Sequence, residues 1–177
     1  MTLDGYCDHT AVVADEELHQ YYSELLEKAG VLLYGRVTCQ LMEFWKDLAL
    51  NPSGQKDLDD FARIMDKVPK VVFSRTLKDP DWHSARLAGS SIEETVKSLR
   101  LDSGKDIYVG SPGLIVSLTN LGLIDEYQLC VHPVIAGRGL PLFYKIAQTH
   151  VLELYQVKTL TSGVVVLNYT RKAGSHE

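Results

Sequence analysis

Three short apolar runs in this chain each end in a turn that contains glycine, arginine or serine. Residues 31–34 lead into Gly35-Arg36, residues 71–73 into Ser74-Arg75-Thr76, and residues 107–109 into Gly110-Ser111-Pro112-Gly113. Stretches with helical spacing of apolar residues separate the runs, which is typical of parallel strands joined by helices. Parallel neighbours end at one edge of a sheet, where open α/β folds bind ligands and helix N-termini attract anions. The pattern therefore predicts an anion-binding edge.

Helical spacing on either side of the first run predicts two helices. Asp15 is expected to cap the first helix, and Gly30 is expected to end it. The second helix is expected to turn one apolar face to the core, made of Val37, Leu41, Phe44, Trp45 and Leu48. Further amphipathic stretches precede the second and third runs, and Ser91 stands three residues before Glu94 in a capping-box pattern.

The C-terminal third changes from helical spacing to strict alternation. After a helix that Ser111 and Pro112 would open and Gly122 would end, residues 126–132 alternate between apolar and polar side chains, which predicts a strand. His132 is expected to be half-exposed on it. Residues 151–158 and 163–170 are two further strand candidates, joined by a turn that contains Gly163. The predicted fold class is α/β, with a mixed, mostly parallel sheet and an antiparallel C-terminal hairpin.

Length and composition indicate one domain, residues 1–172, followed by a solvated tail, residues 173–177. The chain has 177 residues, of which 45% are apolar, enough to fill one core. Its 18 basic and 23 acidic residues give a net charge of -5 without a basic block, so nucleic acid is not expected as a partner. No apolar run approaches the ~18 residues of a membrane span, and no signal segment is recognised.

The spacing of cysteines and histidines bears on whether disulfides or a metal site are expected. The 3 cysteines are far apart and the 6 histidines show no paired ligand spacing, so neither a disulfide framework nor a metal site is expected. This cysteine usage fits a reducing compartment, and a cytoplasmic protein is expected. Asp4, Asp8 and His9 form the only compact set of titratable residues that could face a ligand, although surface loop residues are the ordinary explanation.

Each turn after an apolar run also has an ordinary interpretation. Gly35-Arg36 can be a simple turn with a solvated charge, and the turn from Gly110 to Gly113 can be a purely structural junction. The joint pattern favours a dinucleotide, which needs several separate anion contacts, and an arginine near the adenosine ribose favours a 2′-phosphate, hence NADP(H). The standard motifs G-x-G-x-x-G and G-x-x-x-x-G-K-[ST] are absent, which disfavours the ordinary nucleotide folds.

Taken in order, these segments resemble one known family. Thr2-Leu3-Asp4-Gly5-Tyr6, residues 33–38, residues 72–76 and the long block 110–143 are similar to the dihydrofolate reductase-like superfamily. The matching branch is the reductase (C-terminal) domain of the bifunctional riboflavin biosynthesis deaminase-reductase, found also as stand-alone bacterial proteins. The segments cover nearly the whole chain. Family members usually carry several more residues before the first segment, so either the first strand is short or the start is truncated.

The resemblance implies a three-layer α/β/α fold with NADPH across the strand ends. The implied cofactor contacts are Gly35, Arg36 and Thr38 on phosphates, Ser74, Arg75 and Thr76 at the 2′-phosphate, and Gly110, Ser111, Pro112, Gly113 and Leu114 beside the pyrophosphate and nicotinamide. Asp4, Tyr6 and His9 would face a small heterocycle of the 5-amino-6-(5-phosphoribosylamino)uracil or pterin type. No catalytic residue is assigned, because capping explains the acidic residues 15–17. Related reductases commonly dimerise, so a homodimer is expected.

Two other functions stay open from the sequence. One is a protein that binds NADP(H) and has lost the reaction, since no acid or base can be named. The other is an assembly module with an apolar surface around Gly137-Arg138-Gly139 and the following Pro141-Leu142-Phe143.

Overall fold

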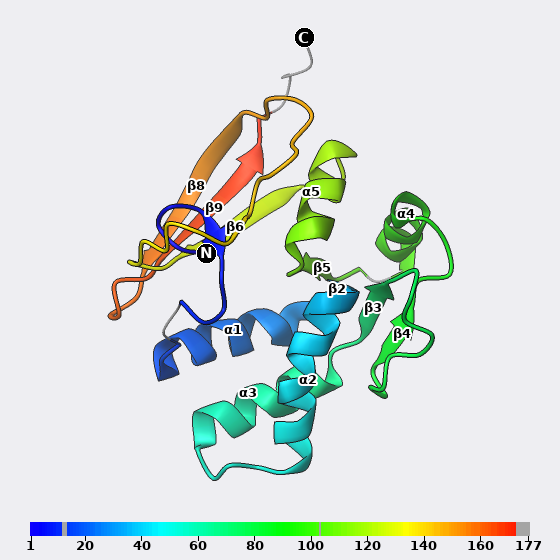
Figure 1. Cartoon of the computed structure of the whole chain (residues 1–177), viewed down its shortest axis with the longest axis vertical. Helices are drawn as coiled ribbons and strands as arrows, with labels where there is room; N and C mark the ends of the chain where they lie inside the picture. Colours follow the sequence, from blue (N-terminus) through cyan, green and yellow to red (C-terminus); the bar gives the residue numbers. More distant parts are fainter. Residues whose placement is uncertain (12–13, 103, 173–177) are drawn as a thin grey trace. The chain divides into compact units, whose positions relative to one another are not determined.

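The computed structural model describes residues 1–11, 14–102 and 104–172, which form two compact units (Figure 1). Residues 16–114 make up the parallel-sheet unit, and residues 1–15 together with 115–177 make up the antiparallel-sheet unit. The expected tail, residues 173–177, lies outside the described residues. The expectation of a single domain over residues 1–172 stays a prediction.

The parallel-sheet unit alternates helices and strands, as the spacing of apolar residues predicts. Its four strands pair in the order β4-β3-β2-β5, and every neighbouring pair is parallel. In chain order the elements are α1 (Glu16–Lys28), β2 (Ala29–Gly35), α2 (Arg36–Leu50), α3 (Lys56–Lys67), β3 (Lys70–Phe73), β4 (Ala85–Leu87), α4 (Ile92–Asp102) and β5 (Asp106–Val109). The three predicted strands are confirmed, and the three-residue β4 is an addition.

The register of the parallel sheet brings the three predicted turns to one edge. Gly35 at the end of β2 lies opposite Phe73 at the end of β3, and Leu33 lies opposite Val109 at the end of β5. Because β2 is the central strand of the three, its turn lies between the other two, and neighbouring strands are about 4.8 Å apart. The predicted convergence of the turns is therefore confirmed within this unit.

Helix α2 turns a different face to the core than the sequence pattern predicts. Val37, Leu41 and Phe44 were expected to lie inside, but they are 59%, 45% and 60% exposed. Of the predicted face, Trp45 does pack against the core, but it does so beside Met42 and the buried Cys39, in a core that α1, α3, β2 and β3 complete. The helix has apolar residues on more than one side, so periodicity alone selects the wrong stripe.

The junctions around β2 and β3 show two further departures. Gly30 does not end α1 but lies within β2, because pairing with β5 starts at Ala29 through a shift in register. Lys70 opens β3 and is 1% exposed, with its Nζ donating to the carbonyl oxygens of Met65 and Val68 and to Ser84 Oγ. The amine thus satisfies carbonyls at the end of α3, and burial lowers the pKa of Lys70 to about 8.

The antiparallel-sheet unit contains the expected C-terminal hairpin. Strands β8 (Leu152–Thr159) and β9 (Val165–Arg171) pair antiparallel, and β6 (Glu126–Val131) pairs on the other side of β9. Two short strands, β1 (Tyr6–Cys7) and β7 (Leu140–Pro141), form a separate pair. Helix α5 (Pro112–Asn120) begins in the parallel-sheet unit and continues into this one.

Two residues of the antiparallel-sheet unit are more buried than the sequence predicts. His132 was expected to be half-exposed but is 6% exposed, because its amide donates to Met1 O at 2.9 Å and Thr2 pairs beside it. Leu142, one residue of the suggested assembly surface, is also buried, with its amide donating to Gly5 O. The N-terminal segment therefore covers side chains that local alternation would leave in solvent.

Candidate functional site

The turn from β2 into α2 presents backbone amides and one exposed arginine. Gly35 precedes α2 with φ of -82° and ψ of 165°, and at this N-cap position no side-chain hydrogen bond to the first amides of the helix is formed within the described residues. Arg36 is exposed, and its Nη1 donates to Gln40 Oε1 at 2.9 Å, which leans the guanidinium along the helix. Thr38 lies in the same first turn. The turn therefore offers a guanidinium and uncapped amides to an anion.

The turn after β3 is held by its own serine. Ser74 Oγ accepts hydrogen bonds from the amides of Thr76 at 3.1 Å and Leu77 at 2.9 Å. These bonds fix the backbone at Arg75, whose side chain is exposed and makes no hydrogen bond or ion pair within the described part of the chain. Ser74 thus shapes the turn, while Arg75 remains available to a ligand.

The turn from β5 into α5 is joined directly to the first turn. Ser111 is 3% exposed, and its Oγ accepts a hydrogen bond from the Gly35 amide at 2.9 Å. Gly110 is exposed beside Tyr34, while Pro112 and Gly113 begin α5. The side chain of Leu114 is buried, so any contact of that residue with a ligand would come from its backbone. The Ser111–Gly35 bond fixes the spacing between two of the three turns.

The edge formed by Gly35-Arg36, Ser74-Arg75-Thr76 and Gly110-Ser111, here called the three-turn edge, has a positive electrostatic character. Helices α2 and α5, which begin there, carry no acidic residue in their first turns, whereas α1, α3 and α4 each carry two. The positive ends of these two helix dipoles are therefore not offset by a carboxylate in the first turn of their own helix. Two arginines, uncapped amides and hydroxyls form a donor set that fits the phosphates of a dinucleotide.

The predicted substrate residues Asp4, Tyr6 and His9 belong to the antiparallel-sheet unit, whereas the three-turn edge belongs to the parallel-sheet unit. Asp4 accepts hydrogen bonds from Thr2 Oγ1 at 2.6 Å and from the Gly137 amide at 2.7 Å. These bonds lower the pKa of Asp4 to about 2, so the carboxylate is ionised at neutral pH. Asp4 thus ties the N-terminal turn to the loop after β6.

The other two residues have different surroundings. Tyr6 lies in β1 opposite Pro141, and its side chain lies 3.5 Å from the point where a Cβ on Gly139 would be. Gly139 has a φ of 129°, which favours glycine independently of that contact. His9 is exposed between Asp8 and Thr10, whose side chains bond to each other at 2.7 Å. The sequence motifs gave no signal for the Asp4–Gly137 bond, which joins residues 133 positions apart.

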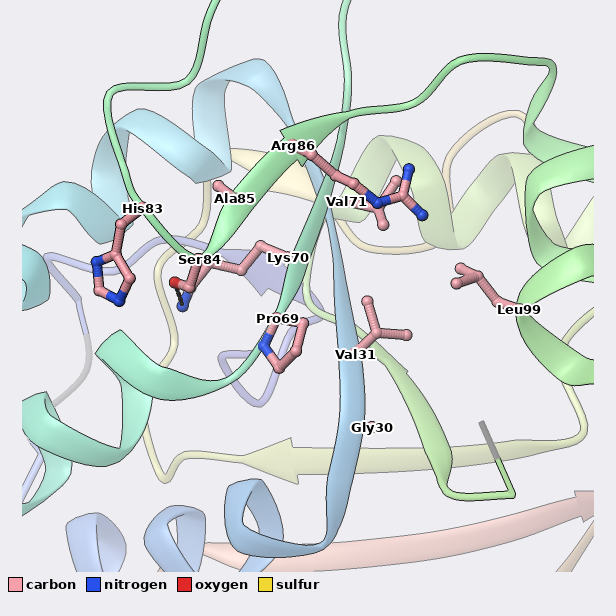
Figure 2. A pocket seen from close by; sticks show the side chains of 10 residues that line it. All are labelled: Gly30, Val31, Pro69, Lys70, Val71, His83, Ser84, Ala85, Arg86 and Leu99. Atoms are coloured by element: carbon pink, nitrogen blue, oxygen red, sulfur yellow. Dashed lines mark hydrogen bonds between the residues drawn. The ribbon is translucent and has the colours of Figure 1, made fainter. Parts of the chain in front are cut away.

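A hollow of about 270 Å³ lies elsewhere in the parallel-sheet unit (Figure 2). It is placed at the start of β2 and β3, where Gly30, Val31 and Lys70 line it together with Arg86 on β4 and Leu99 on α4. The three-turn edge lies at the other end of the same strands, and none of its residues lines the hollow. Within the described ranges, no group of three metal-binding side chains was found, and no helix is long and apolar enough to cross a membrane.

Comparison with known proteins finds a matching family model, a relative of similar sequence and several solved structures of similar fold. The model of the RibD C-terminal domain matches residues 1–166. The chain is 32% identical over 173 residues to YyaP of Bacillus subtilis, a protein described as uncharacterized, and the match covers 96% of this chain and 90% of YyaP.

Solved structures show the same fold at low sequence identity. A Shewanella protein assigned to riboflavin biosynthesis has a TM-score of 0.71 and 19% identity, with 97% of this chain and 94% of that chain covered. A pyrimidine reductase-like protein of Corynebacterium diphtheriae has a TM-score of 0.63 and 14% sequence identity, with 97% of this chain and 88% of that chain covered. A Thermotoga maritima deaminase and 5-amino-6-(5-phosphoribosylamino)uracil reductase has a TM-score of 0.64 and 17% sequence identity. The match covers 97% of this chain and 54% of that longer chain. The predicted dihydrofolate reductase-like α/β fold is confirmed.

Proposed function

Because the chain belongs to the RibD C-terminal domain family, we propose that it is a reductase that uses NADPH to reduce a small heterocyclic substrate. The observation that carries this proposal is the three-turn edge, where two exposed arginines and two helix N-termini free of acidic residues lie at the ends of neighbouring parallel strands. When bound, NADPH would supply the hydride. The chain would bind the cofactor, orient it and exclude water.

Each turn has its own part in the proposed cofactor site. The uncapped amides after Gly35 and the Arg36 guanidinium would bind phosphate oxygens, with the Thr38 hydroxyl in the same helical turn. Gly110 leaves room for close approach of the pyrophosphate, since a Cβ there would meet only the Tyr34 ring at 3.7 Å. Pro112, Gly113 and the backbone of Leu114 would continue the contact along the first turn of α5.

Arg75 is the proposed contact of the adenosine 2′-phosphate, the group that distinguishes NADPH from NADH. Its side chain is exposed and has no partner among the residues that the structure describes, while Ser74 holds the backbone on either side of it. A preformed turn with an available guanidinium binds a dianionic phosphate without first breaking an internal ion pair. Thr76 adds a hydroxyl beside it.

The proposed substrate is a pyrimidine of the 5-amino-6-(5-phosphoribosylamino)uracil type, with a pterin as the less favoured choice. The support comes from the family, and from the reductase names of two proteins that share the fold. Asp4, Tyr6 and His9 stay the proposed substrate contacts. The Asp4 carboxylate already accepts bonds from Thr2 and Gly137, so its contribution would be to shape the loop beside the substrate.

A titration and a turnover assay test this function in two separate steps. Calorimetry with NADPH and NADH is expected to show binding that is clearly tighter for NADPH. Equal or undetectable binding of both would contradict the cofactor assignment. Oxidation of NADPH against a panel of pyrimidines and pterins then separates a reductase from a protein that binds NADP(H) without turning it over. Binding without turnover on any member would favour that alternative.

Arginine variants test the assignment of each turn. Arg36→Ala and Arg75→Ala are each expected to weaken NADPH binding by about 10- to 150-fold, equivalent to ~1.5–3 kcal/mol for a lost charged contact. Arg75→Ala should also reduce the preference for NADPH over NADH more than Arg36→Ala does. Arg86→Ala, which removes an exposed arginine from β4 of the same sheet, is the matched control and should leave binding unchanged. An unchanged preference in Arg75→Ala would refute the 2′-phosphate contact.

The proposed setting is a homodimer in the cytoplasm. Cys7, Cys39 and Cys130 are free thiols, which suits a reducing compartment. Exposed apolar side chains on β8 support association with a second copy. Light scattering at several protein concentrations is the measurement that tests the homodimer.

A further inference from the structure

The hollow at the start of β2 and β3 has an apolar floor. Val31 and Val71 are buried and lie on one face of the sheet, because Val71 is opposite Leu33, two residues after Val31. Leu99 points toward them from α4 (Figure 2). Gly30 is the extra residue where the pairing of β2 with β5 shifts register, and it adds no side chain. The hollow therefore lies between apolar side chains of the sheet and of α4.

Arg86 supplies an available charge beside this floor. It lies opposite Val71 in the parallel ladder of β3 and β4, so the two side chains point to the same face of the sheet. In Figure 2 the Arg86 side chain reaches from β4 toward α4. Arg86 is exposed and makes no hydrogen bond or ion pair with any residue that the structure describes. Its guanidinium is thus available to a ligand that enters the hollow.

The other polar side chains of the hollow are engaged within the protein. Lys70 Nζ donates to Ser84 Oγ at 3.0 Å and to backbone carbonyls at the end of α3. Ser84 Oγ in turn donates to the carbonyl oxygen of Asp66 at 2.6 Å. His83 Nδ1 lies 3.7 Å from Oδ1 of Asp66. These groups already have partners, which leaves Arg86 as the anchor for a ligand.

The charges at this end of the sheet favour an anion. Among the described residues that line the hollow, Lys70, His83 and Arg86 are basic and none is acidic. Helices α1, α3 and α4 end shortly before β2, β3 and β5, and each has a basic residue in its last turn. These residues are Lys28, Lys67 and Arg100. The negative end of each helix dipole is therefore offset by a basic side chain of its own helix.

We propose that the hollow binds a small organic carboxylate with an apolar body, its carboxylate on Arg86 and its body against Val31, Val71 and Leu99. One guanidinium donates two parallel hydrogen bonds to a planar carboxylate. A dianionic phosphate would bring a second charge without a partner next to apolar walls, which is costly.

The size and place of the hollow define the ligand further. Its volume of about 270 Å³ lies just below the roughly 300–1,000 Å³ of ordinary ligand pockets, so an acid with a single ring is the size that fits. The hollow is at the opposite end of the strands from the three-turn edge. The proposed site is therefore separate from the proposed cofactor site, and the two can be tested independently.

Benzoate is the probe for this site. In a carbon–proton spectrum it is expected to shift the methyl signals of Val31, Val71 and Leu99 and to saturate with a dissociation constant on the order of 1 mM, as befits so small a ligand. Benzamide has the same shape without the charge and should bind about tenfold more weakly or worse. Acetate keeps the charge but leaves the apolar floor uncovered, so it should also bind about tenfold more weakly or worse.

An arginine variant tests the anchor. Arg86→Ala should raise the dissociation constant of benzoate about tenfold or more, because the charge-assisted bonds are lost. The same variant should bind NADPH as the wild type does, since the three-turn edge is at the other end of the strands. Lys78→Ala removes an exposed cation from the loop between β3 and β4 that does not line the hollow, and it is the matched control. It should bind benzoate like the wild type.

Each outcome decides the proposal. Absence of a saturable shift at the three methyl-bearing residues would overturn it, and so would equal binding of benzamide or of acetate. Unchanged benzoate affinity in Arg86→Ala would overturn the anchor. Should that variant fold poorly, the comparison of benzoate with benzamide on the wild type gives the same answer. Displacement of benzoate by NADPH would show that the probe occupies the cofactor site instead. Failure of benzoate to bind leaves the proposed NADPH binding untouched.

Discussion

Replacing Ser111 with alanine tests whether the three-turn edge is held together in the way the structure shows. Ser111 is 3% exposed, and its Oγ accepts a 2.9 Å hydrogen bond from the Gly35 amide. The alanine variant leaves that amide without this acceptor at a half-buried position. The expected loss is about 1–2 kcal/mol of unfolding free energy, within the range for a buried donor that loses its partner. For a chain of this length, this corresponds to a drop in Tm of about 2–8 °C.

The same substitution should also weaken NADPH, because the Gly35 and Gly110 turns are no longer fixed to each other. No more than the lost 1–2 kcal/mol can be transmitted to the ligand, so the Kd should rise by less than about 30-fold. Urea unfolding gives the stability, and calorimetry gives the affinity. Ser162→Ala, which removes a hydroxyl from the exposed hairpin turn, is the matched control. A Ser111→Ala protein as stable as this control would refute the role of the bond.

Three further substitutions give separable outcomes. Gly110→Ala should leave the urea midpoint unchanged within experimental error, because the added Cβ meets only the Tyr34 ring at 3.7 Å. The same variant should bind NADPH measurably more weakly. Unchanged affinity in a calorimetric titration would place the pyrophosphate elsewhere. Lys70→Met should lower the unfolding free energy by roughly 1.5–3 kcal/mol, since buried carbonyls at the end of α3 lose a charged donor, and an equally stable variant would contradict this. Asp4→Asn should lower the thermal midpoint at neutral pH, because the variant loses the carboxylate charge. The pKa of Asp4 in the folded protein is about 2, below the ordinary value of 3.8. The stability advantage of the wild type is therefore fully present above pH 3.8 and is lost as the pH falls through about 2. A difference that stays constant from pH 7 to pH 2 would show that the carboxylate charge is not what stabilises the loop.

Local patterns in the sequence were sufficient for the elements that carry the site. The three apolar runs became β2, β3 and β5, and the capping box of Ser91 and Glu94 opens α4 as predicted, with the two side chains bonded at 2.9 Å. These features depend on periodicity and on contacts only a few residues apart. The parallel order then followed from the alternation of helices and strands, which is why the convergence of the turns could be predicted.

The predictions that were wrong involve contacts between distant segments. Phe44 belongs to a helix with apolar residues on more than one side, and only the packing of Trp45 against Phe61 of α3, at 4.5 Å between ring centroids, decides which side is buried. His132 is covered by the first residues of the chain, which no alternation pattern reports. The Asp4–Gly137 hydrogen bond, which the sequence did not predict, likewise joins segments far apart in the chain. Long-range pairs of this sort need a folded structure, because their partners are not neighbours in sequence.

Backbone amide shifts on addition of NADPH test the central claim most directly. A two-dimensional nitrogen–proton spectrum resolves the amides of Gly35, Arg75, Gly110 and Ser111 as separate signals. The account predicts that these signals move together and saturate at one concentration, with Arg75 moving less when NADH replaces NADPH. Movement confined to Val31 and the other residues that line the hollow at the opposite end of the strands, with the three turns unchanged, would contradict it.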